Sequence, residues 1–509
     1  METKTAAIEM RNITKRFGQV LANDKVWLNI YRGEILALLG ENGSGKTTLM
    51  NMLSGIYFPD EGEIKIDGKE VVIRSPKDAF DNGIGMIHQH FKLVDVLTAA
   101  ENIVLGLPGK LDLKAASAKI REICDKYGFS VDPAQKIYDM SVSQKQTVEI
   151  VKVLYRGADI LILDEPTAVL TPQETDKLFA VLRNMRNDGK AIVIITHKMH
   201  EVEALSDRVA ILRHGQFIGD MLTAHTNAQE MTNMMVGHAV SLNIERPDPV
   251  DPKPRIEVKG LTVRSVDGIV KLDDVSFTAN SGEILGIAGI SGCGQKELLE
   301  AIAGLQTVES GSISYIEDDG SREELIGKDP LSIAELGVSL SFVPEDRLGM
   351  GLVGNMNLAD NMMLRSFRRG KSIFTDRRSP RALAESVVQE LSVSTPSVDT
   401  PVRRLSGGNV QKVLVGREIA SAPTVLLTAY AVRGLDIHSS YTIYDLINRQ
   451  KKAGVAVIFV GEDLDVLLEL CDRILVLCGG KVSGIVSGRG AEKREVGMMM
   501  TKLGGQSHE

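Results

Sequence analysis

Four residues near the N-terminus have the types and the spacing of a phosphate-binding loop. Gly40, Gly45, Lys46 and Thr47 fit the pattern G-x-x-x-x-G-K-S/T. Such glycines let backbone N–H groups approach phosphate oxygens, the lysine reaches the terminal phosphates, and the hydroxyl can ligate Mg²⁺. The apolar run LALL precedes the loop and a helical stretch follows it. The pattern predicts nucleotide binding, with a tight strand-to-helix turn as the alternative.

An acidic pair follows another apolar run. Asp164 and Glu165 come directly after ILIL, which reads as a buried strand. One carboxylate can hold a metal, directly or through water, and its neighbour can polarise an attacking water, as phosphoryl transfer to water requires. Most acidic pairs lie in solvated loops, but solvation does not explain a pair at the end of a buried strand. We therefore expect nucleotide hydrolysis.

The composition is that of an ordinary globular protein. The 509 residues suggest two to four domains, with 43% hydrophobic and 25% charged residues. No apolar run approaches the roughly 20 residues of a membrane span, and the N-terminus lacks a secretion signal, so a cytosolic chain is expected. The four cysteines form no CxxC pair and are expected to be buried and reduced. The formal charge of -8 argues against nucleic acid as the main partner.

The elements around these residues occur twice. GEIL precedes both GENGSGKTTLMNMLSG and GISGCGQKELLEAIAG, and ILILDEPTAVL aligns with VLLTAYAVRGL. In each half, Val/Ile/Leu runs alternate with amphipathic helical stretches, which predicts an α/β fold with a mainly parallel core sheet and antiparallel hairpins. A helical lobe is expected from about residue 90 to 140. The proline-rich RPDPVDPKP lies between the halves, so the predicted domains are 1–240 and 255–509, with a linker over 241–254.

The motifs together resemble the ATP-binding cassette (ABC) family. The resemblance rests on GENGSGKTT, MIHQHF, LSGGNVQK, LILDEPT and ITH, which are spread over the chain in family order. It implies two tandem ABC-type nucleotide-binding domains that use ATP and Mg²⁺. Implied nucleotide contacts in the first half are Phe17, Gly40, Asn42, Gly43, Ser44, Gly45, Lys46, Thr47 and Thr48. Implied metal ligands are Thr47, Gln89 and Asp164, and implied catalytic residues are Glu165, His197 and Gln89. Phe17 would stack on adenine, although it could equally be a core residue.

The two halves have lost complementary parts of this set. In the second half, Gln295, Lys296, Ala429, Tyr430, Glu345 and Glu462 stand where the first has Lys46, Thr47, Asp164, Glu165, Gln89 and His197. In the first half, Ser141, Val142, Ser143 and Gln144 stand where the second has Ser406, Gly407, Gly408 and Asn409. Thr171 likewise stands opposite Asp436. A β-branched Val142 would obstruct the N–H groups that a glycine pair exposes.

ABC cassettes pair head to tail, each nucleotide lying between one loop and the other half's signature. Under that resemblance, the first-half loop and acids combine with Ser406, Gly407, Gly408, Asn409 and Asp436 into one complete site. The other site receives only altered parts and is expected to be a spacer or a non-catalytic pocket. The alternative is that each half has merely diverged.

Fused cassettes with LSGGNxQK, VPEDR and RGLD resemble the motor subunits of bacterial importers for simple sugars and nucleosides. GISGCGQKEL and YRGADILILDEPTAVLTPQE are more similar to the nucleoside branch. The implied partners are two transmembrane permease subunits, identical or mixed, and an extracellular substrate-binding lipoprotein, with this chain peripheral on the cytoplasmic face of the membrane. Alternatives are a sugar importer, for ribose or galactose, a soluble ABC translation factor, and a regulatory ATP-binding module, which Glu165 and His197 disfavour.

Overall fold

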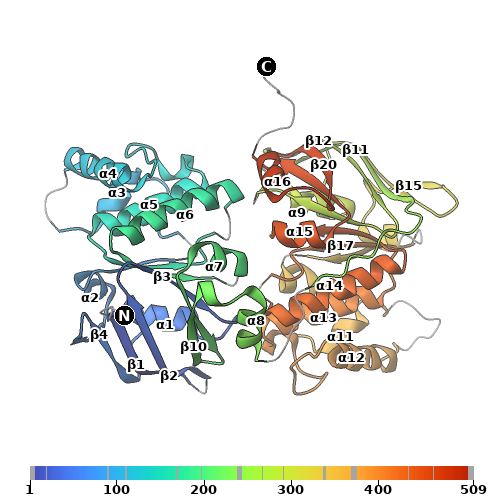
Figure 1. Ribbon diagram of the computed structural model, residues 1–509. Coiled ribbons are helices and arrows are strands. Elements are labelled where there is room, and N and C mark those ends of the chain that lie inside the picture. Colours follow the sequence, from blue (N-terminus) through green and yellow to red (C-terminus); the bar gives the residue numbers. More distant parts are fainter. Residues whose placement is uncertain are drawn as a thin grey trace. The chain divides into compact units, whose positions relative to one another are not determined.

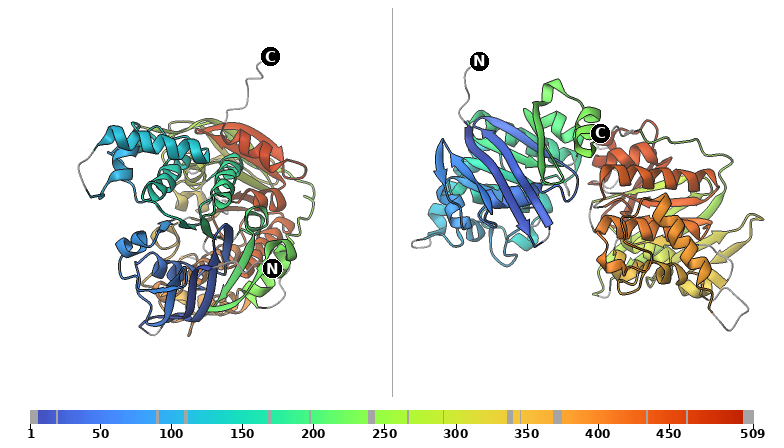
Figure 2. Two further views of the ribbon diagram at one scale, coloured as in Figure 1. Left: turned by 60° about the vertical axis from the view of Figure 1, so that its left-hand side comes forward. Right: turned by 90° about the horizontal axis from the view of Figure 1, so that it is seen from below.

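The structure is a computed structural model. It describes residues 6–501 except 19, 89–90, 109–111, 168–169, 197, 238–242, 266, 291, 336–339, 345, 368–374, 434 and 462. The chain divides into two compact units, Met1–Ser241 and Leu242–Glu509, and each is described by itself (Figures 1 and 2).

A mainly parallel sheet forms the core of the first unit. Among the described residues its strand order is β10-β9-β3-β8-β7-β6, and only β10 runs antiparallel to its neighbour. Every residue of β3, β7 and β8 is buried, because both faces of the sheet pack against other parts of the unit. The strands are β3 (Glu34–Leu39), β6 (Ile84–Ile87), β7 (Ile160–Asp164), β8 (Ala191–Ile195), β9 (Arg208–Arg213) and β10 (Gln216–Leu222).

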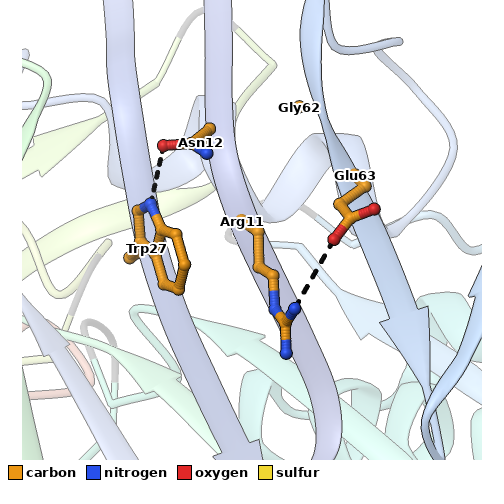
Figure 3. A pocket seen from close by; sticks show the side chains of 5 residues that line it. All are labelled: Arg11, Asn12, Trp27, Gly62 and Glu63. Carbon is orange, nitrogen blue, oxygen red and sulfur yellow. Dashed lines mark hydrogen bonds and ion pairs between the residues drawn. The ribbon is translucent and has the colours of Figure 1, made fainter.

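A second, antiparallel sheet has the order β2-β1-β4-β5. It comprises β1 (Ala6–Phe17), β2 (Val20–Tyr31), β4 (Glu61–Ile66) and β5 (Lys69–Val71), and the first strands are drawn in blue in Figure 2. A bulge interrupts β1 at Asn12, whose φ is 52°. The Trp27 indole N–H donates to Asn12 Oδ1 over 2.7 Å, and Arg11 pairs with Glu63 beside it (Figure 3). The bulge turns the end of β1 that carries Phe17.

The helices of the first unit form two groups. Helix α1 follows β3 directly, whereas α3 to α6 gather on the side of the unit away from β1, β2 and β4 (Figure 1). The helices are α1 (Lys46–Leu53), α2 (Pro76–Asp81), α3 (Ala99–Val104), α4 (Leu113–Tyr127), η1 (Ile137–Asp139), α5 (Val142–Tyr155), α6 (Pro172–Asn187), α7 (Met199–Leu205), η2 (Thr223–His225) and α8 (Ala228–Val236). The predicted helical lobe corresponds to α3, α4 and η1.

The second unit repeats this topology. Its described strands form sheets of order β12-β11-β14-β15 and β16-β17-β18-β13-β19-β20, the same neighbour relations as in the first unit. The strands are β11 (Pro254–Arg264), β12 (Val270–Asn280), β13 (Ile284–Ala288), β14 (Ser310–Ile316), β15 (Arg322–Glu324), β16 (Leu340–Val343), β17 (Val425–Ala429), β18 (Ala456–Val460), β19 (Arg473–Cys478) and β20 (Lys481–Ser487). The helices are α9 (Gln295–Ile302), α10 (Pro330–Glu335), η3 (Arg347–Gly351), α11 (Leu358–Met363), α12 (Arg378–Glu390), η4 (Val402–Arg404), α13 (Gly407–Ala420), α14 (Ile437–Lys452), α15 (Leu464–Leu470) and α16 (Lys493–Met499). The predicted α/β fold with antiparallel and helical subdomains is confirmed in both halves.

The proline-rich segment packs on the second unit. Arg246 Nη1 donates to the carbonyl of Leu468 over 2.7 Å, and Asn448 Nδ2 donates to the carbonyl of Glu245 over the same distance. Lys451 also donates to the carbonyl of Pro247. The described part of the predicted linker is therefore attached to the second unit. Among the described helices, none combines the length and the apolar character needed to cross a bilayer.

Candidate functional site

The loop between β3 and α1 has the backbone of a phosphate cradle. Gly40, Gly43 and Gly45 have φ values of 156°, 83° and 96°, which residues other than glycine rarely adopt. A Cβ on Gly40 would lie 2.3 Å from Ser44 Oγ, and one on Gly45 would lie 2.3 Å from the carbonyl oxygen of Ala22. Helix α1 begins at once, with no side-chain cap on its first N–H groups. These donors can bind an anion.

Lys46 lies inside this loop. Its side chain is buried, and Nζ donates to the carbonyl oxygens of Gly40 over 2.6 Å and Glu41 over 2.9 Å. Burial lowers the pKa of Lys46, while the charges of Glu165, Asp164 and Glu41 partly oppose that effect. The lysine is thus a desolvated cation that backbone carbonyls hold in place.

Two oxygen ligands converge at the start of α1. Thr47 Oγ1 lies 3.4 Å from Asp164 Oδ2, at the end of β7. Burial, and secondly the charge of Glu165, raise the pKa of Asp164 to about 6, against the Thr47 hydrogen bond and the Lys46 charge. A divalent cation would relieve this buried charge.

Glu165 has a strained backbone. Its φ is 45°, and its N–H donates to the carbonyl of Ile195 over 2.8 Å, which ties the end of β7 to the end of β8. Parallel strands deliver their carboxyl ends to one edge of the sheet, so the acid follows Asp164 at the edge where the loop lies.

The other two predicted catalytic residues, Gln89 and His197, lie outside the described residues. Thr196 precedes position 197, and its hydroxyl donates to Glu201 Oε2 over 3.2 Å. The hydroxyl of Thr167, which follows the acidic pair, donates to the other oxygen of the same buried carboxylate. Glu201 therefore links the segment that follows β7 to the segment that follows β8.

The remaining predicted nucleotide contacts of the first half have side chains that reach the surface. Asn42 is exposed, Thr48 is half-buried, and Phe17 is 41% exposed at the end of β1. Phe17 is therefore not a core residue. Sequence reasoning missed Asn23 on β2, which is fully buried and whose Nδ2 donates to the carbonyl of Gly45 over 3.3 Å. A polar residue inside a strand was the available signal.

The corresponding loop of the second unit keeps the backbone and changes the side chains. Gly292 and Gly294 have φ values of 86° and 98°. Gln295 is buried, and its Nε2 donates to the carbonyl of Ile290 over 3.2 Å, much as Lys46 contacts Glu41. Lys296 is exposed and pairs with Glu300 over 3.8 Å on its own helix. This loop therefore has a neutral amide where the first has a cation.

The residue after β17 in the second unit has the same backbone conformation as Glu165 after β7 in the first. Tyr430 has a φ of 53°, and its N–H donates to the carbonyl of Val460 over 2.9 Å, the same arrangement as at Glu165. Ala429 is buried and offers no oxygen ligand. The two other replacements, Glu345 and Glu462, lie outside the described residues.

The signature segments start homologous helices. Ser406 caps α13, its Oγ accepting from Asn409 N over 3.4 Å, whereas Ser141 and Gln144 form a capping box on α5. Val142 is 40% exposed in the first turn of α5, where α13 has Gly407. Gly407 and Gly408 leave the first two positions of α13 without side chains.

Sequence reasoning also missed Arg347, which braces the second signature. Its Nη1 donates to the carbonyl of Gly407 over 2.9 Å, and Nη2 donates to the carbonyl of Arg433. Arg347 belongs to VPEDR, Gly407 to LSGGN and Arg433 to VRGLD, so one guanidinium joins three motifs. Its position within VPEDR was the only signal.

Asp436 is a helix cap in this structure. Its carboxylate accepts from Ser439 N over 2.7 Å and from Ser439 Oγ over 2.6 Å at the start of α14. Thr171 caps α6 at the same position of the first unit. Capping alone accounts for either residue, and a contact of Asp436 with nucleotide stays a prediction.

The residues present fit a nucleotide phosphate with Mg²⁺. Ser44 Oγ and Asn23 Oδ1 are buried polar atoms without a hydrogen-bond partner, one in the loop and one against it. Thr47 and Asp164 supply the hard oxygen ligands that Mg²⁺ prefers.

Comparisons with known proteins agree with this geometry. The family model described as "ABC transporter" matches residues 23–168 and 272–428. The chain is 42% identical to the "Nucleoside import ATP-binding protein NupA" of Lactococcus lactis subsp. cremoris, over 99% of both chains. It is 39% identical to the "Glucose import ATP-binding protein TsgD13" of Haloferax volcanii, over 98% of this chain and 96% of that protein. It is 40% identical to the "Guanosine import ATP-binding protein NupO" of Bacillus subtilis, over 97% of both.

The chain therefore belongs to the ABC transporter family and consists of two ABC ATPase cassettes. The resemblance drawn from the motifs is confirmed.

Asp164→Asn is expected to stabilise the nucleotide-free protein while abolishing ATPase activity. The raised pKa means that the folded state holds the proton more tightly than the unfolded state, so wild-type stability from this group falls as pH rises through about 6. We expect a gain on the order of 1–2 kcal/mol at pH 8. The gain should shrink on acidification to pH 5. Thermal unfolding across this pH range measures it.

Asp159→Asn is the matched control, at the other end of the same strand. Asp159 pairs with Lys190 over 2.9 Å and is exposed, so its substitution should give no gain. A gain for Asp164→Asn that does not change with pH would contradict the buried-charge explanation.

Arg347→Ala is expected to loosen the start of α13. The substitution removes donors to Gly407 and Arg433, so amide hydrogen exchange over residues 405–410 should accelerate. Arg347→Lys should restore slow exchange only in part, because an ammonium lacks the planar set of donors of a guanidinium. Arg404→Ala, at an exposed neighbouring arginine, is the control. Unchanged exchange in Arg347→Ala would show that this brace is unimportant.

Proposed function

We propose that this chain is the ATP-hydrolysing motor subunit of an importer, with one hydrolytically competent ATP site. The proposal rests on one observation: the two units have the same backbone at the phosphate loop and at the acid position, but different side chains there. The first unit has Lys46, Asp164 and Glu165 around a glycine cradle, and the second has Gln295, Ala429 and Tyr430 on the same backbone. A neutral amide and two residues without carboxylates cannot replace the cation, the metal ligand and the base.

The complete site would be composite. The loop and acids of the first unit would combine with Ser406, Gly407, Gly408, Asn409 and Asp436 of the second, in a head-to-tail pairing of the two cassettes. Support comes from the open first turn of α13, which has no side chain at Gly407, against the capping box and Val142 at the start of α5. Of the two signature helices, α13 has the less obstructed first turn, because Gly407 and Gly408 stand where α5 has Val142 and Ser143.

The residues divide the chemistry between them. The Lys46 ammonium would neutralise charge that develops on the terminal phosphate, and its preorganised position inside the loop would require little rearrangement during reaction. The Glu165 carboxylate would accept the proton of the attacking water. Gln89 and His197 would contact the water and the terminal phosphate, as the family resemblance implies. Mg²⁺, held by Thr47, Asp164 and Gln89, would supply Lewis-acid stabilisation of phosphate charge.

The expected cargo is a nucleoside. Two of the relatives are named as nucleoside and guanosine import proteins, which favours this cargo over a simple sugar such as ribose or galactose; the relative named for glucose keeps the sugar as the second candidate. The chain would work with two transmembrane permeases, identical or mixed, and an extracellular substrate-binding lipoprotein, from the cytoplasmic face of the membrane. No nucleic acid is required.

Glu165→Gln is expected to reduce ATP turnover by about 10²-fold or more while ATP still binds, because the amide cannot accept the proton. Tyr430→Phe, at the equivalent position of the second unit, is the matched control and should change turnover little. Phosphate release and equilibrium ATP binding on the full chain measure both effects. Equal loss in the two variants would contradict the asymmetry.

The cargo can be tested in the reconstituted complex. With permeases and lipoprotein present, a nucleoside should raise ATPase activity above its basal rate, whereas ribose and galactose should not. Stimulation by a sugar alone would replace the nucleoside proposal with the sugar importer, and a chain that stays soluble beside its permeases would refute the importer.

A further inference from the structure

Two exposed aromatic side chains of the first unit contact each other, one at the end of β1 and one just after α1. Phe17, at the end of β1, is 41% exposed, and Tyr57, which follows α1, is 36% exposed. Their ring centroids are 5.1 Å apart and the ring planes stand at 70°, an edge-to-face contact. Lys15 Nζ lies 5.5 Å from the Phe17 ring centroid and pairs with Asp60 over 2.8 Å. The Phe17 ring is thereby held in one orientation at the surface.

Both rings are attached to the phosphate loop through short segments. Phe17 pairs with Val20 at the end of the β1–β2 hairpin, and Ala22 on the same strand touches the loop at Gly45. Tyr57 N donates to the carbonyl of Asn51 over 3.1 Å, at the end of the helix that the loop begins. The contact between the rings therefore connects the β1–β2 hairpin, which touches the loop at Gly45, with the C-terminal end of α1.

The second unit lacks this aromatic contact although it keeps the backbone around it. Strand register places Ser265 at the position of Phe17, and Gln306 follows α9 as Tyr57 follows α1. The side chain of Gln306 donates to the carbonyl of Arg264 over 3.3 Å.

Both units also have an ion pair near this end of the hairpin, but it uses different strand positions. In the first unit Lys15 pairs with Asp60 over 2.8 Å. In the second, Arg264, which stands at the position of Arg16, pairs with Glu309 over 2.6 Å. The aromatic pair, by contrast, is found in the unit that has the lysine and the acids, and the equivalent described positions of the second unit hold Ser265 and Gln306.

We infer that Tyr57 is a positioning residue for the nucleotide base, acting through Phe17. The inference rests on the proposed function, in which Phe17 stacks on adenine. An exposed ring that rotates freely must be ordered when a base stacks on it, and this loss of side-chain freedom weakens binding. The edge-to-face contact with Tyr57 orders the ring beforehand. Tyr57 thus contributes to the affinity for the base and not to the phosphoryl-transfer step.

The test compares a ligand that has a base with one that lacks it. Tyr57→Ala in the full chain should weaken ATP binding about 2- to 10-fold, the range expected for one aromatic pair. It should leave the affinity for inorganic tripolyphosphate unchanged. In ATPase assays KM should rise by a similar factor at constant kcat. Tyr57→Phe should retain wild-type affinity, because the contact needs the ring and not the hydroxyl.

Phe58→Ala is the matched control. Phe58 is adjacent, aromatic and 49% exposed, but its ring faces Arg74, so its loss should leave ATP affinity unchanged. Tyr57→Ala should have no further effect in a Phe17→Ala background.

Three results would overturn the inference. They are equal loss of ATP and tripolyphosphate affinity in Tyr57→Ala, a full additive loss in the double variant, and wild-type ATP affinity in Tyr57→Ala beside a weakened Phe17→Ala. Wild-type ATP affinity in Phe17→Ala and Lys46→Ala would instead refute the proposed site itself.

Discussion

The buried cation in the first phosphate loop is the interaction on which the rest of this structure depends. Lys46 is removed from water and solvated by the carbonyls of Gly40 and Glu41. Such a group is tolerated because two acids lie close enough to favour its charged form. The glycines with positive φ, the buried strand β3 and the end of β7 that carries Asp164 place the cation and the acids at the same edge of the sheet. In the second unit the cation is absent, and so are the acids.

The two cassettes differ in side chains and not in architecture. Strand order, loop glycines and the backbone of the acid position are the same in both units. The shared backbone therefore belongs to the fold of each cassette, whereas the lysine and the two acids are found at these positions in the first unit. The signature segments show the reverse asymmetry, with glycines at the start of α13 and a capping box at the start of α5. The first half thus has the lysine and the acids, and the second half has the signature glycines.

The sequence predicted the fold and the phosphate loop well because both depend on local patterns. Apolar runs become β3 and β7, and the glycine spacing alone predicts the strand-to-helix turn. The sequence left two roles for Phe17, stacking on a base or packing in the core, because a single residue shows no periodicity. Its exposure in the structure excludes the core. The contacts of Asn23, Tyr57 and Arg347 were missed, since each side chain acts on residues far away in the chain and only a weak signal in the sequence pointed to Asn23 and Arg347. The packing of Arg246 onto Leu468 was hidden for the same reason. The roles of Gln89 and His197 stay predictions.

The left-handed backbone at Tyr430 has a consequence for how this protein can change. Tyr430 carries no carboxylate, yet its φ of 53° is close to the 45° of Glu165, and its N–H is held by the hydrogen bond to the carbonyl of Val460. The second unit therefore keeps the backbone conformation of the acid position without its acid. An acidic side chain introduced at position 430 would start from a backbone that already has this conformation.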